Sequence, residues 1–210
     1  LSADRRHSFR TATGRLLGGE DGAPPRKLIK AGESVRVAVF SPDGHWLALG
    51  MHSGRLRVVS LVEGEASFEF DDTASPIAAL AFDLQGRRLA VGGTDGHLRF
   101  YDVATPKADP RGLLAHTGPV VSVDVAPDGA YIISTGADGA ARVWDWQRQA
   151  LSTLEGGADR VRDARFSSDG KRILRRNGDR ITTFDAEVWA RSDAELIDFA
   201  RGLLGKAPAP

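Results

Sequence analysis

The sequence of 210 residues contains no cysteine, so it can form neither a disulfide bond nor a thiolate metal site. It also lacks an excess of charge, because 28 lysines and arginines balance 28 aspartates and glutamates. A neutral chain has no general attraction to nucleic acid or to an anionic membrane surface. No stretch approaches the roughly 18 consecutive apolar residues of a transmembrane helix, and we therefore expect no membrane segment.

Signs of catalysis are missing as well. No serine stands in a Gly-x-Ser-x-Gly elbow, and without cysteine there is no thiol nucleophile. The five histidines fall at expected turns in separate segments of the chain (His7, His45, His52, His97 and His116). A metal site needs several ligands that converge, and these histidines are not spaced to do so. We therefore expect no catalytic residue, no metal and no cofactor, and hence no enzyme.

What the sequence does contain is a series of short strands joined by tight turns, clearest between residues 114 and 146. Valines alternate with polar residues from 121 to 125, as in a half-buried strand. Two Asp-Gly turns follow, at Asp128-Gly129 and Asp138-Gly139. Glycine tolerates the positive φ that tight hairpin turns require, so this stretch predicts an antiparallel meander. A single meander cannot bury both faces, and it needs neighbours of its own kind.

The same pattern occurs four times. The glycine of the first turn, used here as the reference glycine of each copy, is at Gly44, Gly86, Gly129 and Gly170, in steps of 42, 43 and 41 residues. Nine residues later come Ser53, Asp95, Asp138 and Asp179, and an aromatic-Asp pair recurs at Tyr101-Asp102, Trp144-Asp145 and, one residue early, Phe184-Asp185. A period of about 40–45 residues with a Trp-Asp signature is typical of a propeller blade.

At these residues the chain resembles the WD-repeat family, and the resemblance covers roughly residues 2–189. It implies a hydrogen-bonded tetrad of His116, Ser134, Asp138 and Trp144, which would tie the turns of the third copy to its strands. The other copies lack the histidine or the serine. The implied fold is an all-β WD-repeat β-propeller, a partial ring of about four blades plus a half-blade, with a short C-terminal α-helix.

The repeats divide the chain into segments. Residues 1–17 align with the third and fourth strands of an incomplete blade, the alternative being a degenerate polar tail. A turn-rich linker at 18–32 then precedes four blades, at 33–74, 75–113, 114–157 and 158–190. Closed propellers have roughly 4–8 blades. We therefore expect the ring to be completed by another chain or by an upstream segment of the same protein.

The fourth copy is basic within an otherwise neutral chain. Between residues 160 and 180 stand eight lysines and arginines and only three aspartates. Arg175 and Arg176 replace small hydroxyl residues of the third copy, and we expect them, with Arg162 and Arg172, to contact a partner. An acidic protein is the expected partner rather than nucleic acid, because no aromatic residues are interleaved to stack on bases. The alternative is a solvated edge.

After Asp185 the apolar residues take the spacing of a helix. Ser192 and Glu195 form a capping box, and apolar residues then recur three and four positions apart, which predicts an amphipathic helix at 191–205. Its polar face is acidic, so we expect it to pack on the propeller or a partner domain rather than on a membrane. A WD-repeat run followed by such a helix looks like the C-terminus of large bacterial multidomain proteins, in which a propeller follows a signalling NTPase, a caspase-like protease or a kinase.

We therefore expect a protein-interaction or regulatory module, a sensor or a scaffold, within a larger cytoplasmic bacterial protein. Two alternatives stay open. Incomplete propellers could complete one another into an assembly, or the basic fourth copy could bind nucleic acid or another polyanion.

Overall fold

The computed structural model describes the backbone of residues 7–12, 15–20, 26–27, 33–62, 67–71, 75–103, 108–146, 150–155 and 161–186. Within these ranges every regular element is a β-strand, and the expected all-β fold is confirmed. The helix expected at 191–205, with its capping residues Ser192 and Glu195, lies outside the described residues.

The strands form five antiparallel sheets, A to E, in chain order. Sheet A contains β1 (His7–Ala12), β2 (Arg15–Glu20) and β3 (Arg26–Lys27). Sheet B contains β4 (Val35–Phe40), β5 (Trp46–Met51), β6 (Leu56–Ser60) and β7 (Phe68–Phe70). Sheet C contains β8 (Ile77–Phe82), β9 (Arg88–Gly93), β10 (His97–Asp102) and β11 (Ala108–Leu114). Sheet D contains β12 (Val120–Val125), β13 (Tyr131–Gly136), β14 (Ala140–Asp145) and β15 (Ala150–Glu155), and sheet E contains β16 (Asp163–Phe166), β17 (Arg172–Asn177) and β18 (Arg180–Asp185).

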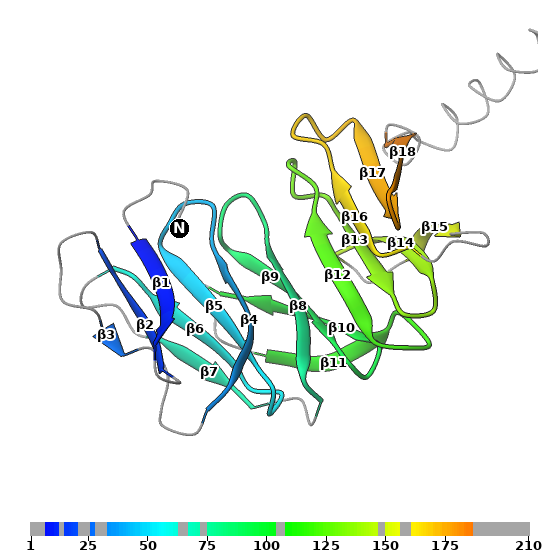
Figure 1. Ribbon diagram of the computed structural model, residues 1–210. Helices are drawn as coiled ribbons and strands as arrows, with labels where there is room; N and C mark the ends of the chain where they lie inside the picture. The colour runs from blue at the N-terminus through cyan, green and yellow to red at the C-terminus, as the bar shows by residue number, and fades with distance from the viewer. Residues whose placement is uncertain are drawn as a thin grey trace, which may run out of the picture.

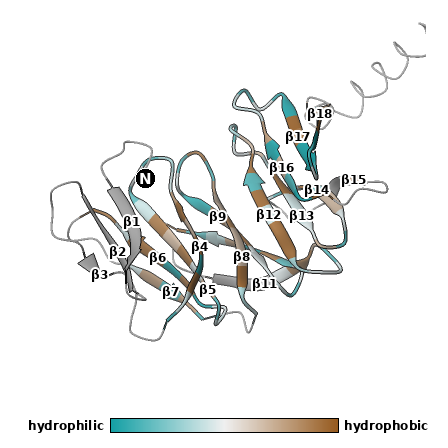
Figure 2. Ribbon diagram, viewed as in Figure 1, coloured by the Kyte–Doolittle hydropathy of each residue, from teal (hydrophilic) through white to brown (hydrophobic). Residues whose placement is uncertain are grey.

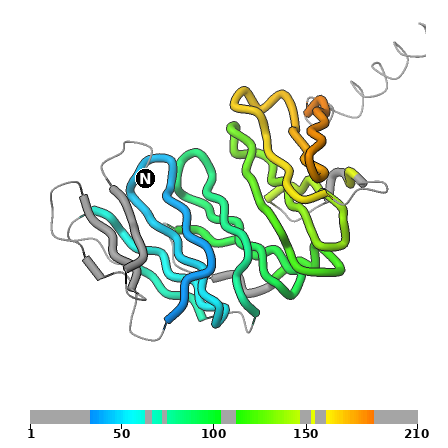
Figure 3. Tube along the Cα trace, in the orientation of Figure 1, coloured from blue at the N-terminus to red at the C-terminus, as the bar shows by residue number. Residues whose placement is uncertain are grey.

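The sheets follow one another along an open arc (Figure 1), and the chain passes through B, C, D and E in order (Figure 3). The first strands of neighbouring sheets contact each other, β4 with β8, β8 with β12 and β12 with β16. These strands therefore lie on the inner side of the arc, as the innermost strands of propeller blades do.

The expected segments and the observed sheets differ at two places. β11 runs through Leu114, one residue beyond the expected boundary at 113. β1 and β2 pair with each other where the last two strands of an incomplete blade are expected, but β2 continues to Glu20 and β3 pairs with it. The segment 18–32, expected to be a linker, is thus partly strand.

Sheets B and C, and likewise sheets C and D, meet where an apolar side chain lies directly against a glycine. A Cβ added to Gly50 would lie 2.5 Å from Cγ2 of Ile77, and one added to Gly92 would lie 2.5 Å from Cγ1 of Val120. We call this position, six residues after each reference glycine, the seat; in sheets D and E it is occupied by Thr135 and Arg176. Only a residue without a side chain allows the first strand of the next sheet to approach so closely.

Apolar side chains form clusters between successive sheets. Figure 2 shows hydrophobic stretches along strands such as β8 and β12, which contribute to these clusters. Between B and C the cluster includes Ala48, Val58, Phe70, Ile77, Leu80, Leu89, Val91 and Tyr101. Between C and D it includes Ala90, Leu98, Phe100, Val120, Val123, Ile132 and Trp144. Between D and E it includes Ile133, Val143, Val161, Ala164 and Ile173. Each sheet is therefore stabilised by the next one, because a blade alone leaves its apolar faces in water.

Sheet E differs from the others in its second turn. β17 and β18 are joined by two residues, since Asn177 pairs with Arg180, whereas three residues separate β13 from β14. The shorter turn explains why the aromatic-Asp pair of the fourth copy comes one residue early. Phe184 pairs with Ile173 in the same way as Trp144 pairs with Ile132.

The shorter turn also changes which residue of the fourth copy corresponds to Asp138. Asp138 stands directly before Gly139, whose φ is +88°, and in sheet E the positive φ of +58° belongs to Gly178. The residue before Gly178 is Asn177, while Asp179 follows it and is exposed. Relative to this glycine the fourth copy has Asn177 where the third has Asp138, although in strand register Asn177 corresponds to Gly136. Asp179 was assigned to the role of Asp138 by sequence spacing alone.

Candidate functional site

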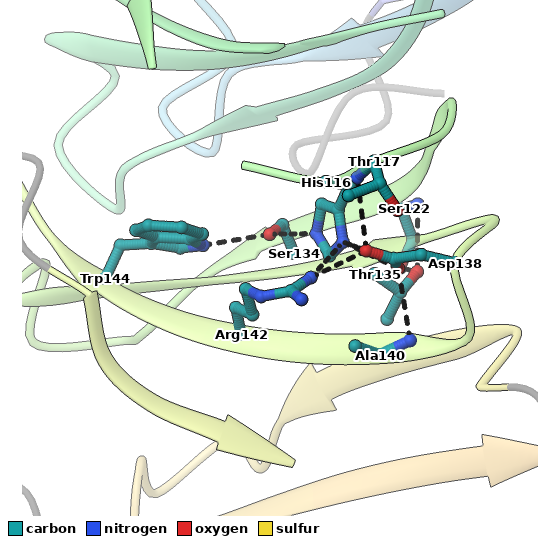
Figure 4. Close-up of polar contacts among 9 residues, drawn as sticks. All are labelled: His116, Thr117, Ser122, Ser134, Thr135, Asp138, Ala140, Arg142 and Trp144. Carbon is teal, nitrogen blue, oxygen red and sulfur yellow. Dashed lines mark hydrogen bonds and ion pairs between the residues drawn. The ribbon is translucent and has the colours of Figure 1, made fainter. Parts of the chain in front are cut away.

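The four residues expected to form a tetrad lie in one hydrogen-bonded chain in sheet D (Figure 4). Trp144 Nε1 donates to Ser134 Oγ over 2.9 Å. Ser134 Oγ lies 2.8 Å from His116 Nε2, and His116 Nδ1 lies 3.0 Å from Asp138 Oδ1. Asp138 also accepts a hydrogen bond from the backbone N–H of Ala140. The chain thus joins β13 and β14 to the turn between them and to the segment before β12.

Both ring tautomers of His116 find partners in this chain. With the proton on Nδ1, the ring donates to Asp138 and Nε2 accepts from Ser134; with the proton on Nε2, the ring donates to Ser134 Oγ and Nδ1 accepts from Arg142. Burial lowers the pKa of His116; hydrogen bonding and the charge of Asp138 oppose this, and the Arg142 cation adds to it. The imidazole is therefore neutral at pH 7.

Asp138 is ionised over the whole ordinary pH range. Burial acts to raise its pKa, but hydrogen bonds from Arg142, from the Ala140 amide and from His116 outweigh burial and lower the pKa to about 2. Asp138 is thus a carboxylate anion that accepts hydrogen bonds from the surrounding donors.

Serine, histidine and aspartate in this order have the hydrogen-bond pattern of a hydrolase triad. Ser134 and His116 are, however, 0% and 2% exposed. The serine oxygen is enclosed between Trp144 and His116, and no substrate atom can approach it. These three residues therefore act as a structural link and cannot serve as a nucleophile, base and orienting acid.

Protonation of His116 and Asp138 should weaken the fold at acid pH. A histidine whose pKa falls on folding binds its proton more readily in the unfolded chain, so stability drops as the pH decreases through 6.5. A carboxyl with a lowered pKa contributes above its unfolded value of about 3.9, and this contribution is lost as the pH falls toward 2. We expect urea denaturation at a series of pH values to show both decreases. His116→Gln should reduce the loss of stability below pH 6.5, and Asp138→Asn should reduce the loss toward pH 2. If neither variant changed the dependence of stability on pH, these two residues would not be its cause.

Arg142 is a fifth member of the network that the sequence did not suggest. Its Nη1 lies 2.9 Å from Asp138 Oδ2 and 2.7 Å from Nδ1 of His116. The same repeat position, thirteen residues after the reference glycine, holds arginine in three copies: Arg57, Arg99 and Arg142. This recurrence was visible in the sequence and could have identified the residue.

The two other arginines of this set also pair with acids. Arg99 Nη2 lies 2.7 Å from Asp95 Oδ2, and Arg57 Nη2 lies 2.6 Å from Glu69 Oε1. Both arginines are largely buried. Asp95 therefore belongs to an ion pair that replaces the histidine-containing network of sheet D.

The remaining signature residues separate into packed aromatics and acids at the surface. Tyr101 is buried with its ring centre 4.9 Å from that of Phe70, and Phe184 is half-buried in the cluster between sheets D and E. Asp145 is half-buried, and Asp102 and Asp185 are exposed. The aromatic residues thus contribute packing, and the acids after them lie at the sheet surface.

The four arginines expected to contact a partner lie on different sides of sheet E. Side chains alternate along a strand, so Arg175 and Arg176 point to opposite faces. Arg175 is half-buried, with its guanidinium carbon 4.7 Å from the centre of the Phe184 ring, on the face that packs against sheet D. Arg172 and Arg176 are exposed on the other face, and Arg162 is exposed just before β16. Arg175 and Arg176 therefore cannot act as a pair on one partner surface.

A different set of residues gathers at one end of the inner strands. The register of β4, β8 and β12 shifts near its start, and the residues skipped by the shift are Arg36, Ala78 and Val121. Such bulges turn a side chain out of the ladder. Arg36 and Val121 are exposed, and Arg162 holds the equivalent position in sheet E. We call these four residues the rim.

Metal ligands do not gather in the part of the chain that the structure describes, where no group of three or more His, Asp or Glu residues could hold an ion. The same described ranges contain no helix that is long and apolar enough to cross a membrane.

The sequence model of the WD40 family (WD domain, G-beta repeat) matches residues 64–102 and 109–145. Both segments are similar to WD40 repeats. Each begins near the outer strand of one sheet and ends with the third strand of the next, so the repeat unit joins neighbouring blades. The predicted WD-repeat propeller fold is confirmed.

Similar proteins come from several eukaryotes. SEC12-like protein 1 of Arabidopsis thaliana is 28% identical over 178 residues, which are 76% of this chain and 44% of that protein. Apoptotic protease-activating factor 1 of Rattus norvegicus is 27% identical over 194 residues, 86% of this chain and 15% of that protein. WD repeat-containing protein SL1-17 of Schistosoma mansoni is 31% identical over 63% of this chain and 41% of that protein. The chain thus spans less than half the length of each of these relatives.

The fold itself occurs in a solved assembly. A chain in the crystal structure of a mitotic checkpoint complex superimposes with a TM-score of 0.72 and 18% sequence identity, over 84% of this chain and 58% of that chain. At this identity the likeness concerns the fold.

Proposed function

We propose that this chain is a protein-interaction module, a scaffold or sensor, whose rim residues contact a protein partner. The rim carries this proposal, because one backbone position, repeated in four sheets, presents side chains of three kinds: arginine at 36 and 162, alanine at 78 and valine at 121. The residues beneath the rim are fixed by packing and by the network around His116. A rigid scaffold with variable exposed side chains is suited to recognise a partner by its surface.

The rim also indicates the chemistry of the partner. Its outer members are two exposed arginines, and between them stand Ala78 and Val121, of which Val121 is 45% exposed. A complementary segment has acidic residues on both sides of an aliphatic side chain. Attraction between opposite charges then speeds association and orients the partner, and the aliphatic contact contributes affinity.

A regulatory role in a larger multidomain protein is supported by one similarity. The rat relative is named as an activator of an apoptotic protease, and this chain matches only a small part of its length. We propose a comparable arrangement, in which the propeller segment controls an effector domain such as a signalling NTPase, a caspase-like protease or a kinase. The bacterial origin and the cytoplasmic location expected from the sequence remain parts of this proposal.

The test compares charge reversal in the rim with charge reversal in the turn between β8 and β9 of the same chain. The chain is titrated with fluorescent peptides that carry acidic residues around a central leucine, and with single- and double-stranded oligonucleotides as the polyanion alternative. Arg36→Glu combined with Arg162→Glu should weaken peptide binding at least tenfold. Arg87→Glu, in the exposed turn between β8 and β9, is the matched control and should bind as the unmodified chain does.

Salt distinguishes the two partner classes. A protein contact through two arginines should weaken only moderately between low and physiological salt, whereas binding along a nucleic acid backbone releases many counterions and falls steeply. An equal loss of peptide affinity in the rim variant and in the Arg87→Glu control would contradict the proposal that the rim binds the partner. A steep salt dependence, with oligonucleotides bound more tightly than peptides, would favour the polyanion function.

A further inference from the structure

The contact between the inner strands of sheets D and E is polar, whereas the two preceding contacts are apolar. In those two, the inner strand adds apolar side chains to the cluster that it shares with the next sheet (Val37 and Val39 of β4, Ala79 and Ala81 of β8). Among the described residues, the cluster between D and E contains none from β12. Strand register places Ser122 and Asp124 at the corresponding positions of β12.

Only one of these two polar residues reaches sheet E through a hydrogen bond within the described ranges. Ser122 is bonded inside sheet D, where its Oγ lies 2.8 Å from Oγ1 of the buried Thr135 and its N–H donates to the same oxygen. Asp124 Oδ2 accepts the backbone N–H of Phe166 in β16 over 2.8 Å. β12 and β16 lie side by side (Figure 1), so this hydrogen bond joins the two inner strands directly.

The N–H of Phe166 belongs to the edge of β16 that faces away from β17. The following N–H, that of Ser167, donates to the carbonyl of Arg172 on the β17 side over 2.8 Å. Successive N–H groups of a strand point to opposite sides, and on the other side no described strand pairs with β16. An N–H at such an edge needs an acceptor. The carboxylate of Asp124 supplies it, and a hydrogen bond to an ionised acceptor is roughly twice as strong as one between neutral groups.

Asp124 is an acid in surroundings that disfavour its charge. Burial raises its pKa, and the charge of Asp163 adds to this, while the N–H of Phe166 and the cation of Arg165 oppose it. The two charged side chains that act on Asp124 thus both belong to β16. An alanine, as in sheet C, would avoid the cost of burying a charge. The acid at this position therefore indicates that its contact with sheet E has a role.

β16 connects this contact to the rim. Arg162, the rim residue of sheet E, stands directly before the strand, and Phe166 is the last residue of the strand. The strand is about 13 Å long. A small rotation of sheet E about the contact at Phe166 therefore moves Arg162 relative to Val121, the rim residue of sheet D.

We propose that Asp124 is a positioning residue, which fixes sheet E, and with it Arg162, relative to the rest of the rim. The consequence for binding rests on the proposed function, because it requires a partner that contacts Arg162 and Val121 together. Such a partner binds best when the hydrogen bond between Asp124 and Phe166 is formed. Coupling of this kind is reciprocal, so the bound partner also stabilises the contact between sheets D and E.

The absence of cysteine allows the position of sheet E to be measured with two introduced thiols. Spin labels at Arg36→Cys and Arg162→Cys give a distance that crosses the contact between D and E. Labels at Arg36→Cys and Val121→Cys give one that does not. In the full chain, Asp124→Ala should broaden the first distance distribution about twofold, because an edge N–H then loses its acceptor, and should leave the second unchanged.

Two further variants separate the hydrogen bond from the loss of an acid. Asp124→Asn keeps an oxygen that can accept the N–H of Phe166, and it should keep the narrow distribution between positions 36 and 162. Asp128→Ala removes an exposed acid from the turn between β12 and β13 of the same sheet, and it should leave both distributions unchanged.

Hydrogen exchange examines the contact itself. In Asp124→Ala the amide of Phe166 should exchange about tenfold faster than in the unmodified chain, because its acceptor in sheet D is gone. The amide of Ser167, which is bonded within sheet E, should exchange at its former rate. Equal acceleration at both amides would overturn the proposal, because sheet E as a whole would then be loosened.

The acidic peptides described above test the consequence for binding. Asp124→Ala should weaken peptide binding about threefold in the chain that has Arg162, and should have no effect in the Arg162→Ala chain. An equal effect in both chains would overturn the proposal, as would an unchanged distribution between positions 36 and 162 in Asp124→Ala. If the unmodified chain bound none of the peptides, the proposed function would be wrong, and the distance distributions would still decide whether Asp124 positions sheet E.

Discussion

Trp144→Ala is expected to lower the free energy of unfolding by about 3–5 kcal/mol. The side chain is 3% exposed and belongs to the cluster between sheets C and D, so its removal leaves a large cavity. It also removes the N–H that Ser134 accepts, in a network where the imidazole and the carboxylate are held by the same hydrogen bonds. Urea denaturation followed by far-ultraviolet circular dichroism gives the free energy without depending on tryptophan fluorescence.

Trp46→Ala is the matched comparison. Trp46 occupies the start of β5, is half-buried, and has its ring centre 5.6 Å from that of Phe68. No hydrogen bond of its indole nitrogen within the described residues ties it to a histidine network, and we expect a loss well below that of Trp144→Ala. Equal losses in the two variants would show that the tetrad adds nothing to ordinary aromatic packing.

Sequence spacing was sufficient to predict the sheets for a physical reason. The reference glycines mark turns whose φ values, between +67° and +77°, exclude most side chains. Such a backbone requirement appears in every copy regardless of what surrounds it. The repeat spacing led to the resemblance to the WD-repeat family, and that resemblance implied the tetrad of His116, Ser134, Asp138 and Trp144.

Contacts between sheets could not be predicted in the same way. Arg175 and Arg176 were paired because they replace two small hydroxyl residues of the third copy, yet strand alternation sends one toward Phe184 and the other to the opposite face of sheet E. The rim depends on bulges in β4, β8 and β12, and no glycine or proline lies within the bulged residues themselves. Spacing of residues along one strand carries no information on which neighbouring sheet a side chain will meet.

Gly92→Val is expected to destabilise the fold by about 3 kcal/mol, at the upper end of what overpacking costs. Valine is favoured in strands, and at an ordinary strand position the change would be stabilising. At this seat a Cβ alone would lie 2.5 Å from Cγ1 and 2.9 Å from Cβ of Val120, which is itself buried and β-branched. Neither side chain can rotate away, so sheets C and D must separate.

A control substitution shows whether the loss of stability comes from the close contact at the seat or from replacing any glycine. Gly118→Ala is the control, because a Cβ there would lie at an ordinary 3.4 Å from its nearest neighbour, and we expect a change within about 0.5 kcal/mol. Gly92→Ala should already be destabilising. Combining Gly92→Ala with Val120→Ala should cost less than the sum of the two single losses, because the second change makes room for the first. Strict additivity in that cycle would mean that Val120 does not rest on Gly92.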